Sequence, residues 1–193
     1  MTSFYQKNIQ NILAKVNRLN KTKFVIGIDG AGGAGKSTLA NELIEKLPGT
    51  IIIHMDDFYK QKVLRKLSNS TEEIGAYFDW KRLESQVLVP FKNNEEIIYQ
   101  KYDWQSDSIL PDPYVVKESN LIIEGVYSTR LELAGYYDLK IWIDCPYETR
   151  LQRGIERDGR EMKVYWQNVW QKQEDEYIAT HNAFSNADFI IYS

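Results

Sequence analysis

The sequence predicts an α/β fold, a three-layer sandwich in which a central parallel β-sheet has helices on both faces. Short apolar runs alternate with amphipathic segments along the 193 residues, and most of these runs are apolar at every position. Strands of this kind need cover on both faces, and strands separated by helices pair in parallel. Ligands of such sheets bind at the carboxyl ends of the strands. Functional residues are therefore expected directly after the strands.

The strands and helices can be placed one by one from this pattern. Apolar runs predict core strands at residues 24–28, 50–54, 121–123, 139–143 and 189–192. Helical spacing and helix-start signals predict helices at about residues 1–22, 36–47, 70–88, 146–160 and 160–179. Residues 96–116 predict a small β-hairpin insertion, with Pro111 and Pro113 in its long tip. Without a repeat or a linker, the chain is expected to form a single domain over residues 1–193.

The first 28 residues are basic and contain no acidic residue, which is also typical of a mitochondrial presequence. Ile9, Ile12 and Val16, however, recur at the spacing of one helical face. This spacing favours an amphipathic helix that packs on the domain. Trp166 and Trp170, four positions apart on the last predicted helix, are expected to be core residues in the same way.

Composition argues against several classes of protein. A net charge of −3 is unlike the basic surplus of a nucleic-acid binder. The single cysteine, Cys145, rules out an intramolecular disulfide, and no apolar run approaches the roughly 20 residues that span a bilayer. We therefore expect a cytoplasmic protein that binds neither nucleic acid nor membrane. Its oligomeric state stays open.

A glycine-rich segment directly after the first strand matches the phosphate-binding pattern G-x-x-x-x-G-K-[ST]. It consists of Gly30, Ala31, Gly32, Gly33, Ala34, Gly35, Lys36 and Ser37, and Thr38 follows. Small residues let backbone N–H groups curl around phosphate oxygens, and the following helix adds its free N–H groups. Lys36 supplies a mobile cation, and the Ser37 hydroxyl can bind Mg²⁺. The segment therefore predicts a P-loop with ATP and Mg²⁺ as its ligands.

The same glycines also fit a dinucleotide-binding loop. Gly30, Gly32 and Gly35 match G-x-G-x-x-G, and Asp56 lies about 20 residues further on, where a ribose-binding acid is expected. A dinucleotide site needs neither Lys36 nor Ser37. Their presence favours the P-loop.

Acidic residues follow the second and third strands. Asp56 and Asp57 come after residues 50–54, where a carboxylate can accept the proton of an attacking hydroxyl or can cap a helix. We expect Asp56 to be this base. Glu124 ends the apolar run 121–123, the place of an acid that holds Mg²⁺ beside a P-loop.

Arginines recur on the helix predicted at residues 146–160. Arg150, Arg153 and Arg157 share one helical face. Guanidinium groups stabilise the charge on a transferring phosphoryl group, and a helix that carries them can close over ATP as a lid. The alternative is an exposed surface helix in which arginines alternate with glutamates, because its arginines would have a similar spacing. We predict a lid in which Arg153 and Arg157 are catalytic and Arg150 binds ATP.

Taken together, the motifs resemble the uridine kinase group of P-loop kinases, which includes phosphoribulokinase, bacterial pantothenate kinase and nicotinamide riboside kinase. The resemblance covers about residues 23 to 160. It is carried by the P-loop and by Asp56-Asp57-Phe58-Tyr59, Phe78-Asp79-Trp80, Tyr102-Asp103, Ile123-Glu124-Gly125 and Thr149-Arg150-Leu151-Gln152-Arg153.

The resemblance implies a kinase that phosphorylates a small-molecule hydroxyl, most directly that of a nucleoside such as uridine or cytidine. It places Asp56, Asp57 and Tyr59 at the acceptor. It also implies that Asp79 contacts the ribose and that Tyr102 and Asp103 line the base pocket.

Two departures keep other acceptors open. Uridine kinases often have serine at the position of Asp57, and the paired acid here resembles nicotinamide riboside kinases instead. The segment directly after Asp103, Trp104-Gln105-Ser106, lacks the histidine expected in a uridine or cytidine pocket. The alternatives are a kinase of nicotinamide riboside, pantothenate or another small alcohol, and a nucleotide-binding regulator that transfers nothing.

Overall fold

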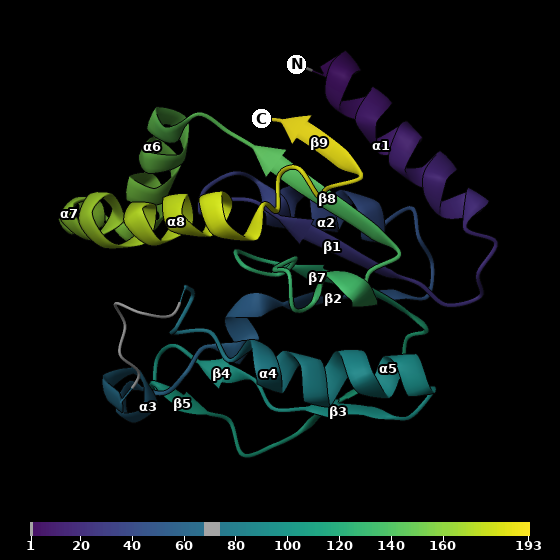
Figure 1. Ribbon diagram of the computed structural model, residues 1–193, viewed down its shortest axis with the longest axis horizontal. Helices are drawn as coiled ribbons and strands as arrows, with labels where there is room; N and C mark the ends of the chain where they lie inside the picture. The colour runs from purple at the N-terminus through teal and green to yellow at the C-terminus, as the bar shows by residue number, and fades with distance from the viewer. Residues whose placement is uncertain (1, 68–73) are drawn as a thin grey trace.

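The computed structural model describes residues 2–67 and 74–193, and the predicted α/β sandwich is confirmed (Figure 1). Five parallel strands form the central sheet in the order β2–β7–β1–β8–β9. They are β1 (Val25–Asp29), β2 (Thr50–His54), β7 (Asn120–Glu124), β8 (Leu139–Asp144) and β9 (Phe189–Tyr192). Because β1 is central, the P-loop that follows it lies between the ends of β7 and β8.

Successive residues of β1 point to opposite faces, and a separate core covers each face. Ile26 and Ile28 pack in one apolar cluster with residues of α1 (Thr2–Arg18) and α2 (Lys36–Ile44). In that cluster Ile9 and Ile12 of α1 are fully buried. Val25 instead joins a second cluster with residues of the helical segment 80–93. This arrangement is the reason why β1 is apolar on both sides.

The remaining helical elements surround these cores. Short ones are η1 (Met55–Phe58), α3 (Lys62–Leu67), α4 (Trp80–Leu83), η2 (Glu84–Leu88), α5 (Val89–Asn93) and η3 (Ala134–Tyr136). After β8 come α6 (Tyr147–Asp158), η4 (Arg160–Met162), α7 (Lys163–Tyr165), η5 (Trp166–Trp170) and α8 (Gln171–His181). In Figure 1 α6, α7 and α8 lie together at one end of the sheet, beyond the carboxyl end of β1.

Two expectations about the middle of the chain were wrong in detail. The helix expected at about residues 70–88 begins at Trp80, because the Asp79 side chain caps it by accepting from the N–H of Arg82, and it continues to Asn93. The expected start lies partly in residues 68–73, outside the described residues. The hairpin tip, expected to be a loop, contains a second ladder. β3 (Ile97–Tyr99) pairs with β6 (Tyr114–Val116), and β4 (Tyr102–Asp103) pairs with β5 (Ser108–Ile109).

Within the described residues, we find no helix with the length and apolarity that crossing a bilayer requires.

Candidate active site

A cavity of about 630 Å³ lies at the carboxyl ends of the central strands, bounded by the P-loop, α6 and the arm from α7 to α8. Its lining includes most of the residues to which the sequence assigned a function: Gly32, Gly33, Gly35, Lys36, Ser37, Thr38, Asp56, Tyr59, Glu124, Arg153 and Arg157. Segments far apart in the sequence therefore meet at the predicted edge of the sheet. Gly30, Ala31 and Ala34 belong to the same loop but do not line the cavity.

The P-loop has the backbone that its glycines predict. Gly33 and Gly35 adopt φ values of 75° and 101°, which other residues rarely reach. A Cβ on Gly33 would lie 2.7 Å from the backbone oxygen of Arg150, so α6 packs directly on the loop. The Lys36 ammonium donates to the carbonyls of Gly30 and Ala31, at 2.9 Å each. To bind a phosphate, the Lys36 ammonium would have to give up these two hydrogen bonds and donate to phosphate oxygens instead.

Glu124 faces the start of α2. The Ser37 hydroxyl lies 3.3 Å from each Glu124 carboxylate oxygen, and His54 Nδ1 lies 2.5 Å from Oε1. The hydrogen bond with Glu124 raises the pKa of His54, although burial opposes this shift. Ser37 and Glu124 thus present hard oxygen donors beside the P-loop, and His54 helps to orient the carboxylate.

The two adjacent acids after β2 have different surroundings. Asp57 accepts a hydrogen bond from the Tyr99 hydroxyl at 3.2 Å and lies 3.6 Å from the Lys101 ammonium. The Asp56 side chain lines the cavity and forms no hydrogen bond with the described part of the chain, although its backbone carbonyl accepts from the Tyr59 N–H at 3.3 Å. Asp56 is exposed to the cavity, yet the surrounding walls raise its pKa by desolvation, and the charge of Glu124 raises it further. Asp56 is therefore the better placed of the two acids to accept a proton.

The arginines of α6 all have partners within the protein. Arg153 donates to the Gly33 carbonyl at 3.2 Å, and Arg157 forms two hydrogen bonds with Asp158. Both line the cavity. Arg150 does not, because its buried guanidinium pairs with Glu174 at 2.8 Å. Arg150 as an ATP ligand stays a prediction, and the structure places it behind the loop.

Asp79, Tyr102 and Asp103, predicted to contact the nucleoside, do not line the cavity. Asp79 caps α4, and Asp103 accepts hydrogen bonds from the backbone and the hydroxyl of Ser106. The Tyr102 hydroxyl donates to Asp107 at 2.7 Å, while its ring packs on Tyr59. Their predicted roles stay predictions, and each side chain already forms hydrogen bonds with nearby residues.

Aromatic side chains form one wall of the cavity, and sequence reasoning missed most of it. Tyr59 is at its centre, with ring centroids 4.5 Å from Trp104 and 5.0 Å from Phe78. Further lining residues that the sequence did not single out as part of the site are Tyr77, Gly125, Val126, Tyr127, Gly154, Asp158, Met162, Trp166, Trp170, Gln173 and Glu174. Trp166 is buried, as expected of a core residue, but it and Trp170 also form part of the cavity surface.

A family model decides the relationship of the chain to known proteins. The model of the phosphoribulokinase/uridine kinase family matches residues 25–193. The chain belongs to this family. The uridine kinase of Ureaplasma parvum serovar 3 is 30% identical over 187 residues, which are 88% of the chain and 89% of the relative. Uridine-cytidine kinase B of Dictyostelium discoideum is 30% identical over 191 residues, covering 89% of the chain and 75% of that protein.

Solved structures agree with this assignment. The structure of a possible uridine kinase from Bacillus stearothermophilus superposes with a TM-score of 0.73 at 26% identity, covering 96% of the chain and 98% of that structure. As a member of the phosphoribulokinase/uridine kinase family, the protein is a phosphotransferase that acts on an alcohol group. The resemblance noted in the motifs is thereby confirmed.

Proposed function

We propose that the protein is an ATP- and Mg²⁺-dependent nucleoside kinase, which transfers the γ-phosphoryl group of ATP to the 5′-hydroxyl of a nucleoside such as uridine or cytidine. One observation carries the proposal: a single cavity contains a phosphate-binding loop, an unbonded carboxylate and an aromatic wall. The names of two relatives, a uridine kinase and a uridine-cytidine kinase, support the choice of acceptor.

The transfer chemistry follows from the placement of charge. The acceptor oxygen attacks the γ-phosphorus, the bond from that phosphorus to the β–γ bridging oxygen breaks, and ADP leaves with the electron pair. Asp56 takes the proton of the attacking hydroxyl. Lys36, Arg153 and Arg157, the cationic residues of the cavity lining, stabilise the negative charge on the transferring group.

The donor set beside the P-loop fits Mg²⁺. Mg²⁺ prefers oxygen ligands and is usually held by one or two protein groups together with phosphate and water. Ser37 and Glu124 supply such oxygens. Among the described residues, no three of His, Cys, Asp or Glu are grouped to hold a metal alone. Ser37 and Glu124 would therefore share the ion with ATP, and the bound ion would neutralise phosphate charge.

The aromatic wall suits a flat acceptor. Tyr59, Tyr77, Phe78, Trp104 and Tyr127 line the cavity. Arg65 lies over the Tyr59 ring, 4.9 Å from its centroid. A base can stack on such rings, whereas a sugar phosphate or pantothenate has no aromatic ring to place there. This supports a nucleoside over pantothenate or a sugar phosphate. It also accommodates the positively charged ring of nicotinamide riboside.

The proposal is tested by measuring ADP release from ATP·Mg²⁺ with uridine, cytidine, nicotinamide riboside, pantothenate and ribulose 5-phosphate in turn. We expect uridine or cytidine to stimulate release well above the rate without acceptor. Stimulation by nicotinamide riboside alone would keep the kinase and change the acceptor. Tight ATP binding without stimulation by any of the five would support a regulator instead. NAD binding that is independent of Lys36 and Mg²⁺ would point to a dinucleotide site.

A further inference from the structure

Two backbone N–H groups in the first half of the P-loop are bound by carboxylates of the protein itself. The Gly30 N–H donates to Asp29 at 2.7 Å, and the Gly32 N–H donates to Glu174 at 2.7 Å. The N–H groups at the start of α2 have no helical partner and stay available to a phosphate. The two carboxylates therefore hold the part of the loop that precedes the predicted phosphate contacts.

Glu174 comes from α8, and the loop fits closely against it. A Cβ on Gly32 would lie 2.9 Å from Glu174 Oε1 and 2.9 Å from the Trp166 ring, so no larger residue fits without displacing one of them. The second Glu174 oxygen accepts from Arg150 at 2.8 Å, and Arg150 also donates to the carbonyl of Cys145 at 3.1 Å. Glu174 thus joins the loop to the first turn of α6 and to the end of β8.

The pairing with Arg150 is required on electrostatic grounds. The side chains of Glu174 and Arg150 are only 6% and 9% exposed. An unpaired carboxylate at such a site would repel a triphosphate, since charges interact strongly away from water. With Arg150 beside it, Glu174 can hold the loop without opposing the charge of the nucleotide.

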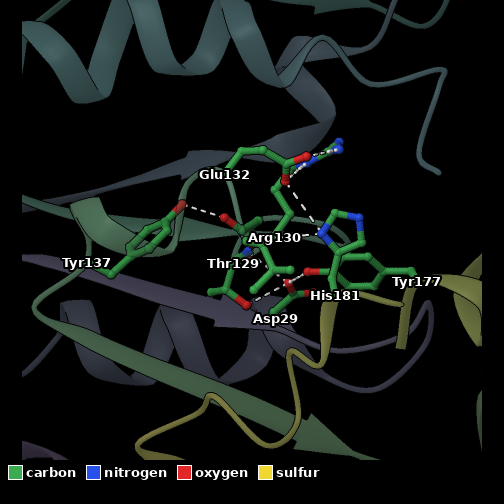
Figure 2. A network of polar contacts seen from close by, with 9 residues as sticks. Asp29, Thr129, Arg130, Glu132, Tyr137, Tyr177 and His181 are labelled. Carbon is green, nitrogen blue, oxygen red and sulfur yellow. Dashed lines mark hydrogen bonds and ion pairs between the residues drawn. The ribbon is translucent and has the colours of Figure 1, made fainter. Parts of the chain in front are cut away.

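Asp29 is also bound by a residue of α8, one helical turn after Glu174. Tyr177, three residues after Glu174, donates to Asp29 at 2.6 Å, and the Thr129 backbone and hydroxyl donate to it at 2.8 Å each (Figure 2). Asp29 is completely buried, and this burial raises its pKa, although the hydrogen bonds oppose the shift. Figure 2 shows Tyr177 and Thr129 converging on the Asp29 carboxylate. Both loop contacts therefore depend on one face of α8.

We propose that Glu174, and Tyr177 through Asp29, are positioning residues that hold the P-loop in its nucleotide-binding shape, and that Arg150 acts through Glu174 and touches no phosphate. The inference rests on the proposed function in one respect, namely that the P-loop binds ATP. It assigns Arg150 a role different from the phosphate ligand expected of a lid arginine.

A double-mutant cycle separates these two roles for Arg150. The variants are Glu174→Gln, Arg150→Met and the double variant, and the readout is ATPγS·Mg²⁺ binding by calorimetry without acceptor. Glu174 accepts from Gly32 and Arg150 through different oxygens, and Gln has only one acceptor oxygen to replace them. Met leaves the Glu174 charge without its cation, so each single variant should bind about tenfold more weakly. In the double variant the Gln carbonyl can still accept from Gly32. It should therefore bind no more weakly than the worse single variant.

Several results would overturn the inference. If Glu174→Gln binds like the wild type, the carboxylate does not position the loop. If the double variant binds about a hundredfold more weakly, the effects multiply and Arg150 acts independently on the nucleotide. Failure of the wild type to bind ATPγS would instead overturn the donor site itself. The matched control is Glu176→Gln, an exposed residue of α8 outside the cavity lining, which should bind normally.

A second variant tests the Asp29 branch without removing a buried charge. Tyr177→Phe deletes the hydroxyl that donates to Asp29, while the ring still packs on Tyr127. We expect KM for ATP to rise about fivefold and KM for the acceptor to stay unchanged, at a temperature well below the melting point. A lower melting temperature with unchanged KM for ATP would show that Tyr177 only stabilises the fold and would overturn this branch.

Discussion

The donor end and the acceptor end of the cavity are built in different ways. At the donor end, hydrogen bonds fix the backbone of the P-loop, and charged side chains such as Lys36 and Arg153 are bonded to loop carbonyls. At the acceptor end, aromatic rings such as Tyr59 and Trp104 pack on one another. Directed bonds give the donor end one defined geometry, whereas stacking tolerates different flat ligands. The comparison therefore predicts strict donor chemistry and an adjustable acceptor.

Lys36→Ala should have the largest effect, because it removes the cation at the centre of the donor end. We expect transfer to fall about a thousandfold, a typical loss when charge stabilisation of the transition state is removed. The melting temperature should change little, since the hydrogen bonds of the Lys36 ammonium to the described residues go to carbonyls of its own loop. A steady-state rate and a thermal melt provide the measurement, and an unchanged rate would contradict the assignment of the donor end.

Asp56→Asn should come next, because Asp56 lies where the two ends meet. We expect kcat to fall about a hundredfold or more, with ATP binding retained. Asp57→Asn is the matched control and should cost less, since Tyr99 and Lys101 hold Asp57 in place.

The pH profile provides an independent check on Asp56. Desolvation by the cavity walls and the charge of Glu124 raise the pKa of Asp56. Only the ionised form accepts a proton, so wild-type kcat should decline as pH falls through that raised pKa. The decline should be absent from the residual activity of Asp56→Asn. The same acid limb in both proteins would assign it to another group.

Trp104→Ala should have a smaller effect and should act on the acceptor end alone. Stacking of a base on an aromatic ring contributes about 1–3 kcal/mol, and the half-exposed Trp104 should lie at the lower end of this range. We expect KM for the acceptor to rise about tenfold and KM for ATP to stay constant. Equal rises in both values would show that the two ends are not separate.

The smallest effect is expected from Glu132→Gln, because Glu132 does not line the cavity. Two hydrogen bonds from Arg130 lower the pKa of Glu132 to about 2, below its ordinary value of 4.5. The ionised group therefore stabilises the fold above about pH 4.5, and this contribution is lost as pH falls toward 2. Glu132 is 40% exposed, so the variant should lose only about 1 kcal/mol of unfolding free energy at neutral pH. Denaturant titrations at pH 7 and pH 3 should show the difference shrinking with acid.

The donor end was predictable because its chemistry restricts which residues can occupy each position. A backbone that curls around phosphate requires glycine at φ values such as that of Gly33, and the motif therefore appears as consecutive letters. Apolar runs likewise predicted all five core strands. Asp56 and Glu124 could be found because each lies at the carboxyl end of an apolar run, Glu124 as the last residue of β7 and Asp56 two positions after β2.

The acceptor wall and the support behind the P-loop could not be found in this way. Trp104, Phe78 and Trp170 reach the cavity from three separate segments, and each is equally consistent with a packing role when the sequence is read alone. Glu174 lies on a predicted helix among other acidic residues, and only the folded chain shows that it accepts from Gly32. Contacts between distant segments leave no local pattern, so the pairing of Arg150 with Glu174 could not be found from the sequence.

The hydrogen bonds to Asp29 also bear on the order in which the protein folds. Its donors Thr129 and Tyr177 lie 100 and 148 positions further along the chain. Closing loops of that length is entropically costly and slow, so such contacts form late. A ribosome-bound chain that has exposed the glycine-rich segment but not α8 therefore lacks the contacts that fix its shape. In refolding, the ability to bind nucleotide should return with the final kinetic phase, after the helices have formed.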